Sequence, residues 1–204
     1  MNKTETIDLA PGQAVYWRQW LPPRQADELL AQLVREVAWQ SASIMLFGQR
    51  HTLPRLQAWY GDPQAIYRYS GLRLVPHRWL PCLSDLAQQV ARQTASPFNA
   101  VLANLYRDGA DSNGWHSDDE PELGDDPVIA SVSLGAERRF RLRNCHNRAQ
   151  TVSIDLQHGS LLWMGQGVQR HWQHQLAKTR KKVGIRVNLT FRQVGRTAAH
   201  PHNA

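Results

Sequence analysis

The segment 184–192 reads Gly184-Ile185-Arg186-Val187-Asn188-Leu189-Thr190-Phe191-Arg192, an unbroken alternation of apolar and polar side chains. Successive side chains of a β-strand point to opposite faces of the sheet, so the pattern predicts a strand with two unlike faces. The apolar face comprises Ile185, Val187, Leu189 and Phe191. The polar face comprises Arg186, Asn188, Thr190 and Arg192. Taken alone, this strand fits a sheet whose polar face meets solvent.

A second strand changes that interpretation. The segment Asn99–Tyr106 is mostly apolar, yet Asn104 and Tyr106 fall two positions apart and therefore share a face. Two strands then offer polar groups on one face each, which predicts a cavity between them that takes a polar ligand.

The second half of the chain is rich in short strand-like segments separated by turn signals such as Asp108-Gly109 and His158-Gly159. Besides Asn99–Tyr106, the predicted strands are Val128–Leu134, Arg139–Arg143, Thr151–Leu156, Ser160–Met164, His171–Leu176 and Val183–Val194. Regular short strands with such turns are typical of an antiparallel sandwich or barrel, and we interpret them as a jelly roll.

The first half of the chain differs in character. Leucine and valine at three- and four-residue spacing predict amphipathic helices over Pro23–Ala38 and Trp79–Thr94. Between them, residues 43–76 are rich in aromatics, Gly and Pro, which favours hairpins and ordered loops. Arginines interleaved with aromatics over residues 50–78 are typical of a nucleic-acid-binding surface. The fold class is therefore α+β, with helices packed on a jelly roll.

The length of 204 residues predicts a single domain, 1–204. Within it we expect an N-terminal extension over residues 1–97, a jelly-roll core over 98–194 and a C-terminal tail over 195–204. Residues 1–21 and 196–204 show no clear pattern, so we expect packing extensions or tails there.

Composition narrows the class of protein. A net charge of +7 and a pI near 9.9 favour a polyanionic partner such as nucleic acid. No apolar run approaches the roughly 18 residues that cross a bilayer, and no signal peptide is evident, so we expect no membrane partner. Two cysteines, Cys82 and Cys145, suit a reducing compartment, and the expected location is the cytoplasm.

The segment Trp115-His116-Ser117-Asp118-Asp119-Glu120 contains a candidate metal site. His116 and Asp118 lie two positions apart, so on an extended segment both side chains project the same way. Downstream, His171 and His174 are each a candidate for the next ligand, and because they lie on opposite faces of a strand only one should contribute. Two His and one carboxylate form the facial triad of non-heme Fe(II) oxygenases, which leaves positions open for a cosubstrate and O₂.

From Leu46 to Val194 the chain resembles the AlkB family of Fe(II)- and 2-oxoglutarate-dependent nucleic-acid dealkylases. The resemblance is carried, in this order, by Asn104-Leu105-Tyr106-Arg107-Asp108-Gly109, His116-Ser117-Asp118-Asp119-Glu120, Ile129-Ala130-Ser131-Val132-Ser133-Leu134-Gly135, His158-Gly159-Ser160-Leu161-Leu162, His171-Trp172-Gln173-His174 and Arg186-Val187-Asn188-Leu189-Thr190-Phe191-Arg192.

This resemblance implies a role for each matching residue. The iron ligands and catalytic centre would be His116, Asp118 and His174. The residues that hold 2-oxoglutarate would be Asn104, Tyr106, Arg186, Asn188, Thr190 and Arg192. His171 would then support the site without binding the metal. Fe(II) is the implied cofactor, with 2-oxoglutarate and O₂ as cosubstrates.

The resemblance extends to Leu46-Phe47-Gly48 and to Tyr67-Arg68-Tyr69, which look like the nucleotide-recognition lid of duplex-acting members. Phe47 would be the finger that enters the base stack when the damaged nucleotide is flipped out. The implied substrate-binding residues are Phe47, Gly48, Arg55, Tyr67, Tyr69, Asp119 and Glu120.

The implied activity is oxidative demethylation of N1-methyladenine or N3-methylcytosine in DNA, with release of succinate, CO₂ and formaldehyde. The expected partner is alkylated DNA, including duplex, with RNA as a further candidate, and the expected state is a monomer. Three alternatives remain at this point. The first is an oxygenase that acts on RNA, on a protein or on a small molecule. The second is a non-catalytic nucleic-acid binder, and the third is a structural Zn site built from the same His residues.

Overall fold

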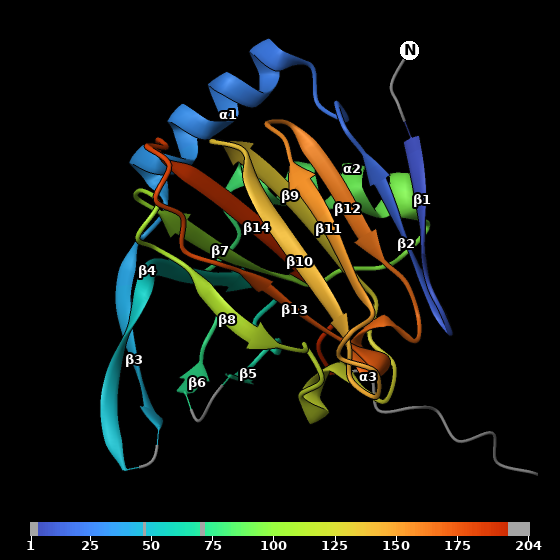
Figure 1. Ribbon diagram of the computed structural model, residues 1–204. Helices are drawn as coiled ribbons and strands as arrows, with labels where there is room; N and C mark the ends of the chain where they lie inside the picture. Colours follow the sequence, from blue (N-terminus) through green and yellow to red (C-terminus); the bar gives the residue numbers. More distant parts are fainter. Residues whose placement is uncertain (1–3, 47, 70–71, 196–204) are drawn as a thin grey trace, which may run out of the picture.

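In the computed structural model, which describes residues 4–46, 48–69 and 72–195, two antiparallel sheets face each other and two helices cover one of them (Figure 1). The larger sheet has eight strands in the order β1-β2-β12-β9-β14-β7-β4-β3. The smaller sheet has four strands in the order β11-β10-β13-β8. A two-stranded hairpin, β5 and β6, lies apart from both sheets. The α+β class and the antiparallel sheets predicted from the sequence are confirmed.

The strands of the larger sheet are β1 (Thr4–Leu9), β2 (Gly12–Trp17), β12 (Ser160–Met164), β9 (Ile129–Gly135), β14 (Arg186–Arg192), β7 (Ala100–Tyr106), β4 (Gln49–Gly61) and β3 (Gln40–Leu46). The strand with two unlike faces, β14, lies between β9 and β7 and is buried at every position. Its polar face therefore does not meet solvent. The apolar and the polar face of β14 are therefore both buried, each in a different environment.

The smaller sheet comprises β11 (Thr151–Leu156), β10 (Arg138–Asn144), β13 (Trp172–Leu176) and β8 (Asn113–His116), and the separate hairpin pairs β5 (Tyr67–Tyr69) with β6 (Leu72–Leu74). The predicted strand over Val183–Val194 is shorter, Arg186–Arg192, and the one predicted from His171 begins at Trp172. His171 instead ends the short helix α3 (Val168–His171). The remaining short helix, a 3-10 turn, spans Pro121–Leu123.

Both predicted amphipathic helices are present, with slightly different ends. The first, α1 (Pro23–Glu36), begins at the predicted proline, whose fixed φ suits the first helical position. The second, α2 (Pro81–Thr94), begins two residues later than predicted. Proline disfavours helical geometry in the residue before it, and Leu80 is accordingly extended, with φ −72° and ψ 141°.

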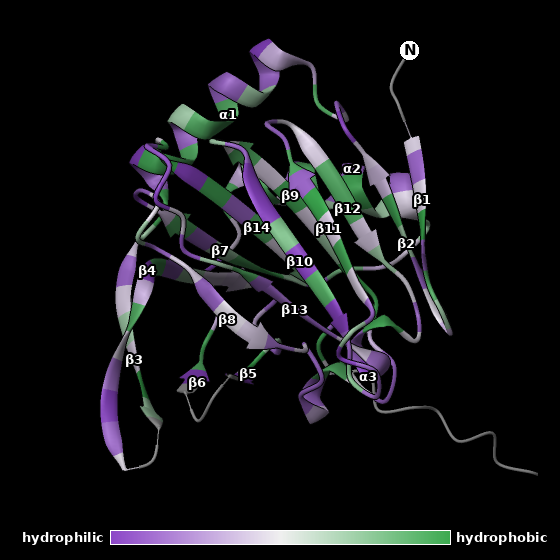
Figure 2. Cartoon of the chain, viewed as in Figure 1, coloured by the Kyte–Doolittle hydropathy of each residue, from purple (hydrophilic) through white to green (hydrophobic). Residues whose placement is uncertain are grey.

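Two hydrophobic cores follow from this layering. In one, α1 and α2 pack on the larger sheet through side chains such as Leu33, Leu86 and Val187. In the other, the inner faces of the two sheets meet around Tyr16, Leu142 and Trp172. Figure 2 shows the contrast between the mostly hydrophobic β9 and the mostly hydrophilic β10. Arg139, Arg141 and Arg143 of β10 alternate with the inward-facing Phe140 and Leu142 because only one face of the smaller sheet is buried, whereas Arg138 is itself buried.

Of the packing extensions or tails expected over residues 1–21, residues 4–17 form a packing extension that belongs to the larger sheet. These residues form β1 and β2, and β2 pairs with β12 so that Val15 lies opposite Trp163. The Trp172 indole Nε1 also donates to the carbonyl of Leu9, 2.8 Å away. The partner strand of this hairpin lies about 150 residues downstream, so no local sequence pattern predicts the place of the hairpin in the sheet.

Among the described residues, no helix combines the length and the apolar character needed to cross a membrane. Neither Cys82 nor Cys145 forms a disulfide in this part of the chain.

Candidate active site

Register between two strands brings the candidate metal ligands together. In the smaller sheet, His174 of β13 pairs directly with His116 of β8, and their ring centroids lie 4.3 Å apart. Asp118 follows two residues after β8 and is 1% exposed. One ligand atom from each of His116, Asp118 and His174 lies within 4.8 Å of the other two. These three residues form the only such cluster of His, Cys, Asp and Glu within the described segments.

His171 lies outside this cluster. It ends α3, and its ring lies 5.8 Å from that of His146. The odd spacing between His171 and His174 predicted that only one would contribute a ligand atom, and the structure brings only His174 to the cluster.

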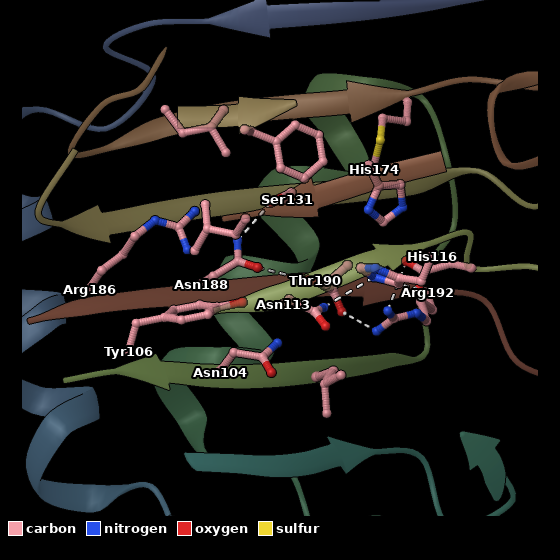
Figure 3. A pocket seen from close by; sticks show the side chains of 16 residues that line it. Asn104, Tyr106, Asn113, His116, Ser131, His174, Arg186, Asn188, Thr190 and Arg192 are labelled. Atoms are coloured by element: carbon pink, nitrogen blue, oxygen red, sulfur yellow. Dashed lines mark hydrogen bonds and ion pairs between the residues drawn. The ribbon is translucent and has the colours of Figure 1, made fainter. Parts of the chain in front are cut away.

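The second group of predicted residues lines the same cavity. All six predicted 2-oxoglutarate residues and the three candidate metal ligands line one pocket between the sheets. Figure 3 shows Arg186 and Tyr106 at one end of this pocket and His116, His174 and Arg192 at the other. Register again provides the reason, because Arg186 of β14 pairs with Tyr106 of β7, and Asn188 pairs with Asn104.

Among the described residues, the Arg186 guanidinium in this pocket has only part of its hydrogen-bonding capacity satisfied. Arg186 is 2% exposed and donates from Nη2 to Ser133 Oγ at 2.9 Å, but its buried Nε has no hydrogen-bond partner. Burial lowers the pKa of Arg186 to about 10, so it stays cationic at neutral pH. A buried cation with spare donors is suited to an anionic ligand such as a carboxylate.

Two of the three candidate metal ligands also have a buried polar atom without a partner among the described residues. Asp118 Oδ1 and His174 Nδ1 are buried and have no hydrogen-bond partner within the described chain. Buried polar atoms are rarely left unsatisfied, so this pattern is typical of a site shaped to bind a further group. One carboxylate and two imidazoles are a donor set that suits Fe(II) and leaves coordination positions open.

An ion pair lies at the end of the pocket that contains the candidate metal ligands. Arg192 Nη2 lies 2.9 Å from Asp118 Oδ2, and both side chains are almost fully buried. Burial disfavours the charged form of Asp118, but Arg192 and then the two His outweigh it and lower the pKa of Asp118 to about 2. Burial would also lower the pKa of Arg192, yet the Asp118 carboxylate raises it above its ordinary value.

Burial keeps the imidazoles neutral. It lowers the pKa of His174 to about 3, with a smaller contribution from His116, and it also lowers the pKa of His116. The His116 Nδ1–H donates to the carbonyl of Gly114 at 2.8 Å, which leaves the lone pair on Nε2. At neutral pH all three side chains are therefore in the deprotonated form that binds a divalent metal.

Several pocket residues have no counterpart among the predicted ones. Asn113 Nδ2 lies 3.2 Å from His116 Nε2, and Ser131 Oγ accepts from Asn188 Nδ2 at 2.7 Å. Both lie inside or beside motifs found in the sequence, but nothing in a strand pattern shows which polar side chain faces a cavity. An apolar wall completes the pocket and comprises Leu102, Phe140, Leu156, Met164 and Leu176.

The predicted substrate-binding residues are placed unevenly. The Tyr67 hydroxyl donates to Glu120 Oε2 at 2.5 Å, and Asp119 is exposed. Gly48 lies in the turn between β3 and β4 with φ +76°, a value that favours glycine. Phe47 and the side chain of Tyr69 lie outside the described residues.

Arg55 is buried rather than exposed at the surface, where a side chain that binds a phosphate would lie. It is 2% exposed, and its Nε donates to Asn104 Oδ1 at 2.8 Å. Its Nη1 donates to the carbonyl of Ser112 at 3.3 Å. Arg55 thus lies behind the pocket, against a residue that lines it.

Comparison with known proteins gives a consistent family. Residues 13–192 match the model of the 2OG-Fe(II) oxygenase superfamily. Over 180 residues the chain is 42% identical to the human DNA oxidative demethylase ALKBH2, covering 83% of this chain and 69% of that protein. It is 41% identical to the mouse alpha-ketoglutarate-dependent dioxygenase alkB homolog 3, covering 84% of this chain and 62% of that protein.

The solved structure of OsALKBH1 has a similar fold, with a TM-score of 0.60 at 20% identity, over 93% of this chain and all of that one. The family match begins at residue 13, so it includes β2 as well as the segment from Leu46 that the motifs identified. The resemblance predicted from the motifs is thereby confirmed: the chain belongs to the AlkB family of Fe(II)- and 2-oxoglutarate-dependent dioxygenases within the 2OG-Fe(II) oxygenase superfamily.

Proposed function

We propose that this protein demethylates N-alkylated bases in DNA oxidatively, with N1-methyladenine and N3-methylcytosine as substrates. One observation carries the proposal: the cluster of His116, Asp118 and His174 shares a single buried pocket with Arg186 and Tyr106. The 42% identity to a human DNA oxidative demethylase supports DNA as the substrate class. All these residues come from one chain, which is consistent with an active monomer.

In this proposal the pocket holds 2-oxoglutarate through its distal carboxylate and directs its other end to the metal. The Arg186 guanidinium provides the charge for the distal carboxylate, and Tyr106, whose ring lies 5.3 Å from the Arg186 guanidinium carbon, lies beside it. Asn188 is already bonded to Ser131 and accepts from Thr190 Oγ1 at 3.1 Å. Asn188 and Thr190 would therefore shape the pocket wall, whereas Arg186 has the spare donor.

His116, Asp118 and His174 would hold Fe(II), which together with 2-oxoglutarate and O₂ supplies the oxidation of the N-alkyl carbon, with succinate, CO₂ and formaldehyde as products. Arg192 keeps Asp118 ionised and oriented. The apolar wall formed by residues such as Phe140 and Met164 excludes water from the reacting centre, which limits side reactions.

The nucleotide-recognition lid is part of the proposal. It would comprise the β3–β4 and β5–β6 hairpins, with Phe47 as the finger and Gly48 in the turn between β3 and β4. Tyr67 and Glu120, which are hydrogen-bonded, together with Tyr69 and Asp119 would contact the flipped base. A methylated base is cationic and pairs poorly, so it is cheaper to flip, and acidic neighbours favour its positive charge.

Phosphate contacts would come from a basic loop, defined here as residues 177–185, which joins two pocket-lining residues, Leu176 and Arg186. Lys178, Arg180, Lys181 and Lys182 are exposed in it, and the loop has no acidic residue. The Thr179 backbone N–H donates to the carbonyl of Gly109 at 2.9 Å, which holds the loop against the segment that follows β7. Four exposed cations in a loop without an acidic residue suit a polyanionic substrate.

The test is a single-turnover assay. The protein is reconstituted anaerobically with Fe(II) and 2-oxoglutarate, exposed to O₂, and mixed with oligonucleotides that carry N1-methyladenine or N3-methylcytosine, as DNA duplex, DNA single strand and RNA. Mass spectrometry should show loss of one methylene from DNA with the wild type and none with the His174→Ala variant.

Other results contradict particular parts of the proposal. Succinate formation with every oligonucleotide unchanged would refute the substrate while leaving the oxygenase intact. Turnover of RNA alone would replace DNA with RNA. Absence of both succinate and demethylation, with Fe(II) shown to be bound, would refute the assigned active site.

A further inference from the structure

A buried glutamine lies between two of the candidate metal ligands. Gln169 belongs to α3, the helix of four residues that precedes β13, and is 1% exposed. It lies outside the six residues that the family resemblance assigns to 2-oxoglutarate and outside the three assigned to iron. A primary amide in such a buried position needs hydrogen-bond partners, and the identity of those partners indicates its role.

The side-chain carbonyl oxygen of Gln169 lies within hydrogen-bonding distance of both Asp118 and His174. The backbone N–H of Asp118 donates to Gln169 Oε1 at 3.0 Å, and His174 Nε2 lies 3.1 Å from the same oxygen. A backbone N–H can only donate, so the amide atom that faces Asp118 must be the oxygen. That oxygen can only accept, so in the metal-free chain His174 Nε2 carries the proton and donates it.

The other end of the amide is anchored to the pocket wall. Gln169 Nε2 lies 3.6 Å from Met164 Sδ, and Met164 lines the pocket. Sulfur is a weak acceptor, so this contact orients the amide while contributing little energy. The orientation of the carbonyl is therefore set chiefly by Asp118 and His174.

The sheet alone does not fix where Asp118 lies relative to His174. The ladder between β8 and β13 pairs His116 with His174 and is irregular beyond that pair. Asp118 comes two residues after β8, outside any ladder. Arg192 holds its carboxylate, whereas Gln169 holds its backbone N–H.

We propose that Gln169 is a positioning residue for the metal, which sets the spacing of Asp118 and His174 by accepting hydrogen bonds from both. The proposal rests on the metal site of the proposed function. Groups that orient metal ligands typically change affinity by about 10- to 100-fold when they are removed. An amide suits this position because it supplies an acceptor without adding a further negative charge beside Asp118.

The test measures Co(II) binding by the otherwise unmodified protein, without any assay of activity. Co(II) is titrated anaerobically into the wild type and into Gln169→Met, which keeps the length of the side chain and removes the acceptor. The matched control is Gln175→Leu, a half-buried position on the same strand as His174. We expect about 10- to 100-fold weaker Co(II) binding for Q169M, with an altered visible absorption spectrum, and wild-type behaviour for Q175L.

A rescue variant separates positioning from general packing. Gln169→Glu keeps an acceptor oxygen, so it should bind Co(II) at least as tightly as the wild type and give a spectrum close to it. If Q169M fails to fold, Gln169→Asn, which withdraws the oxygen by one methylene, should show the same loss of affinity.

Each remaining outcome is decisive. Wild-type affinity and spectrum in Q169M would overturn the role of Gln169 while leaving the metal site intact. Equal loss in Q169M and Q169E would also overturn it, because the acceptor would then be irrelevant. Failure of the wild type itself to bind Co(II) would instead refute the metal site on which the proposal rests.

Discussion

Arg192 Nη2 lies 2.9 Å from Asp118 Oδ2 in an ion pair whose side chains are 3% and 1% exposed. The pair joins the last residue of the central strand β14 to the loop after β8, and therefore the two sheets to each other. Removing one partner of a buried pair leaves an uncompensated charge, which costs more than the pair itself contributes.

Arg192→Met should destabilise the metal-free protein by about 3–5 kcal/mol. The pKa of Asp118 should rise, because burial would then act on the carboxylate without its main cationic neighbour. Urea unfolding of the metal-free protein measures the loss, with Arg139→Gln as a control that removes an exposed ion pair. Equal stability of R192M and the wild type would contradict the importance of the pair.

The metal-free protein should lose stability as the pH falls below about 6.5. Burial holds the pKa of His174 at about 3 and lowers that of His116, so below 6.5 the unfolded chain binds protons that the folded chain does not. For His174 alone the slope is about 1.4 kcal/mol per pH unit, or roughly 2 kcal/mol between pH 6.5 and 5. Urea titrations at these two pH values measure it.

The His174→Gln variant provides the comparison for this pH dependence, since glutamine does not titrate. Its stability should fall less than that of the wild type over the same interval. Asp118, with a pKa of about 2, adds a further loss only below about pH 4. A pH dependence that is the same in H174Q and the wild type would show that His174 titrates normally.

Asn113→Val should strengthen metal binding. In the metal-free chain Asn113 Nδ2 donates to His116 Nε2, the nitrogen whose lone pair is available, so a metal must displace this hydrogen bond. A hydrogen bond contributes about 1 kcal/mol net, so its removal should raise the Co(II) affinity about fivefold. Competition of Co(II) against a coloured chelator measures this change, and weaker binding by N113V would show that Asn113 assists the metal instead.

Arg186→Gln should weaken 2-oxoglutarate binding by about 10- to 100-fold, because a charge-assisted hydrogen bond is worth about 1.5–3 kcal/mol. In the wild type, 2-oxoglutarate at 100 times its Kd should stabilise the Co(II)-loaded protein by about 2.7 kcal/mol. At the same concentration R186Q should show much less of this stabilisation. Arg139→Gln, an exposed position on β10, should retain it. If 2-oxoglutarate raised the melting temperature of R186Q and of R139Q by the same amount, Arg186 would not be part of the cosubstrate site.

The double variant Lys181→Ala/Lys182→Ala should bind duplex DNA more weakly, by similar factors for different sequences. It should also reduce the slope of log affinity against log salt by about 2, one for each phosphate that the two lysines neutralise in the wild type. Arg24→Ala/Arg35→Ala removes two exposed cations from α1 and should leave the slope unchanged. Identical salt slopes for the two double variants would place the DNA interface elsewhere.

Much of this protein can be predicted from local sequence. The alternation over 184–192, the spacing of His116 and Asp118 and the two amphipathic helices are each determined by side chains a few positions apart, because strand and helix periods are local properties. The order of the motifs was enough to identify the AlkB family, as the superfamily match over residues 13–192 and the identity to ALKBH2 and alkB homolog 3 together confirm.

Tertiary structure decided what local periodicity cannot express. The polar face of β14 is buried because β7 and β9 flank it and the smaller sheet covers the pocket, whereas the same alternation is compatible with an exposed face. The choice of His174 over His171 depends on the register of β13 with β8 and on α3 ending at His171. The hairpin of β1 and β2 and the place of Gln169 between Asp118 and His174 depend on partners distant in sequence or on the path of a loop. Such contacts form only when the chain closes on itself, and for that reason they leave no periodic trace in the sequence.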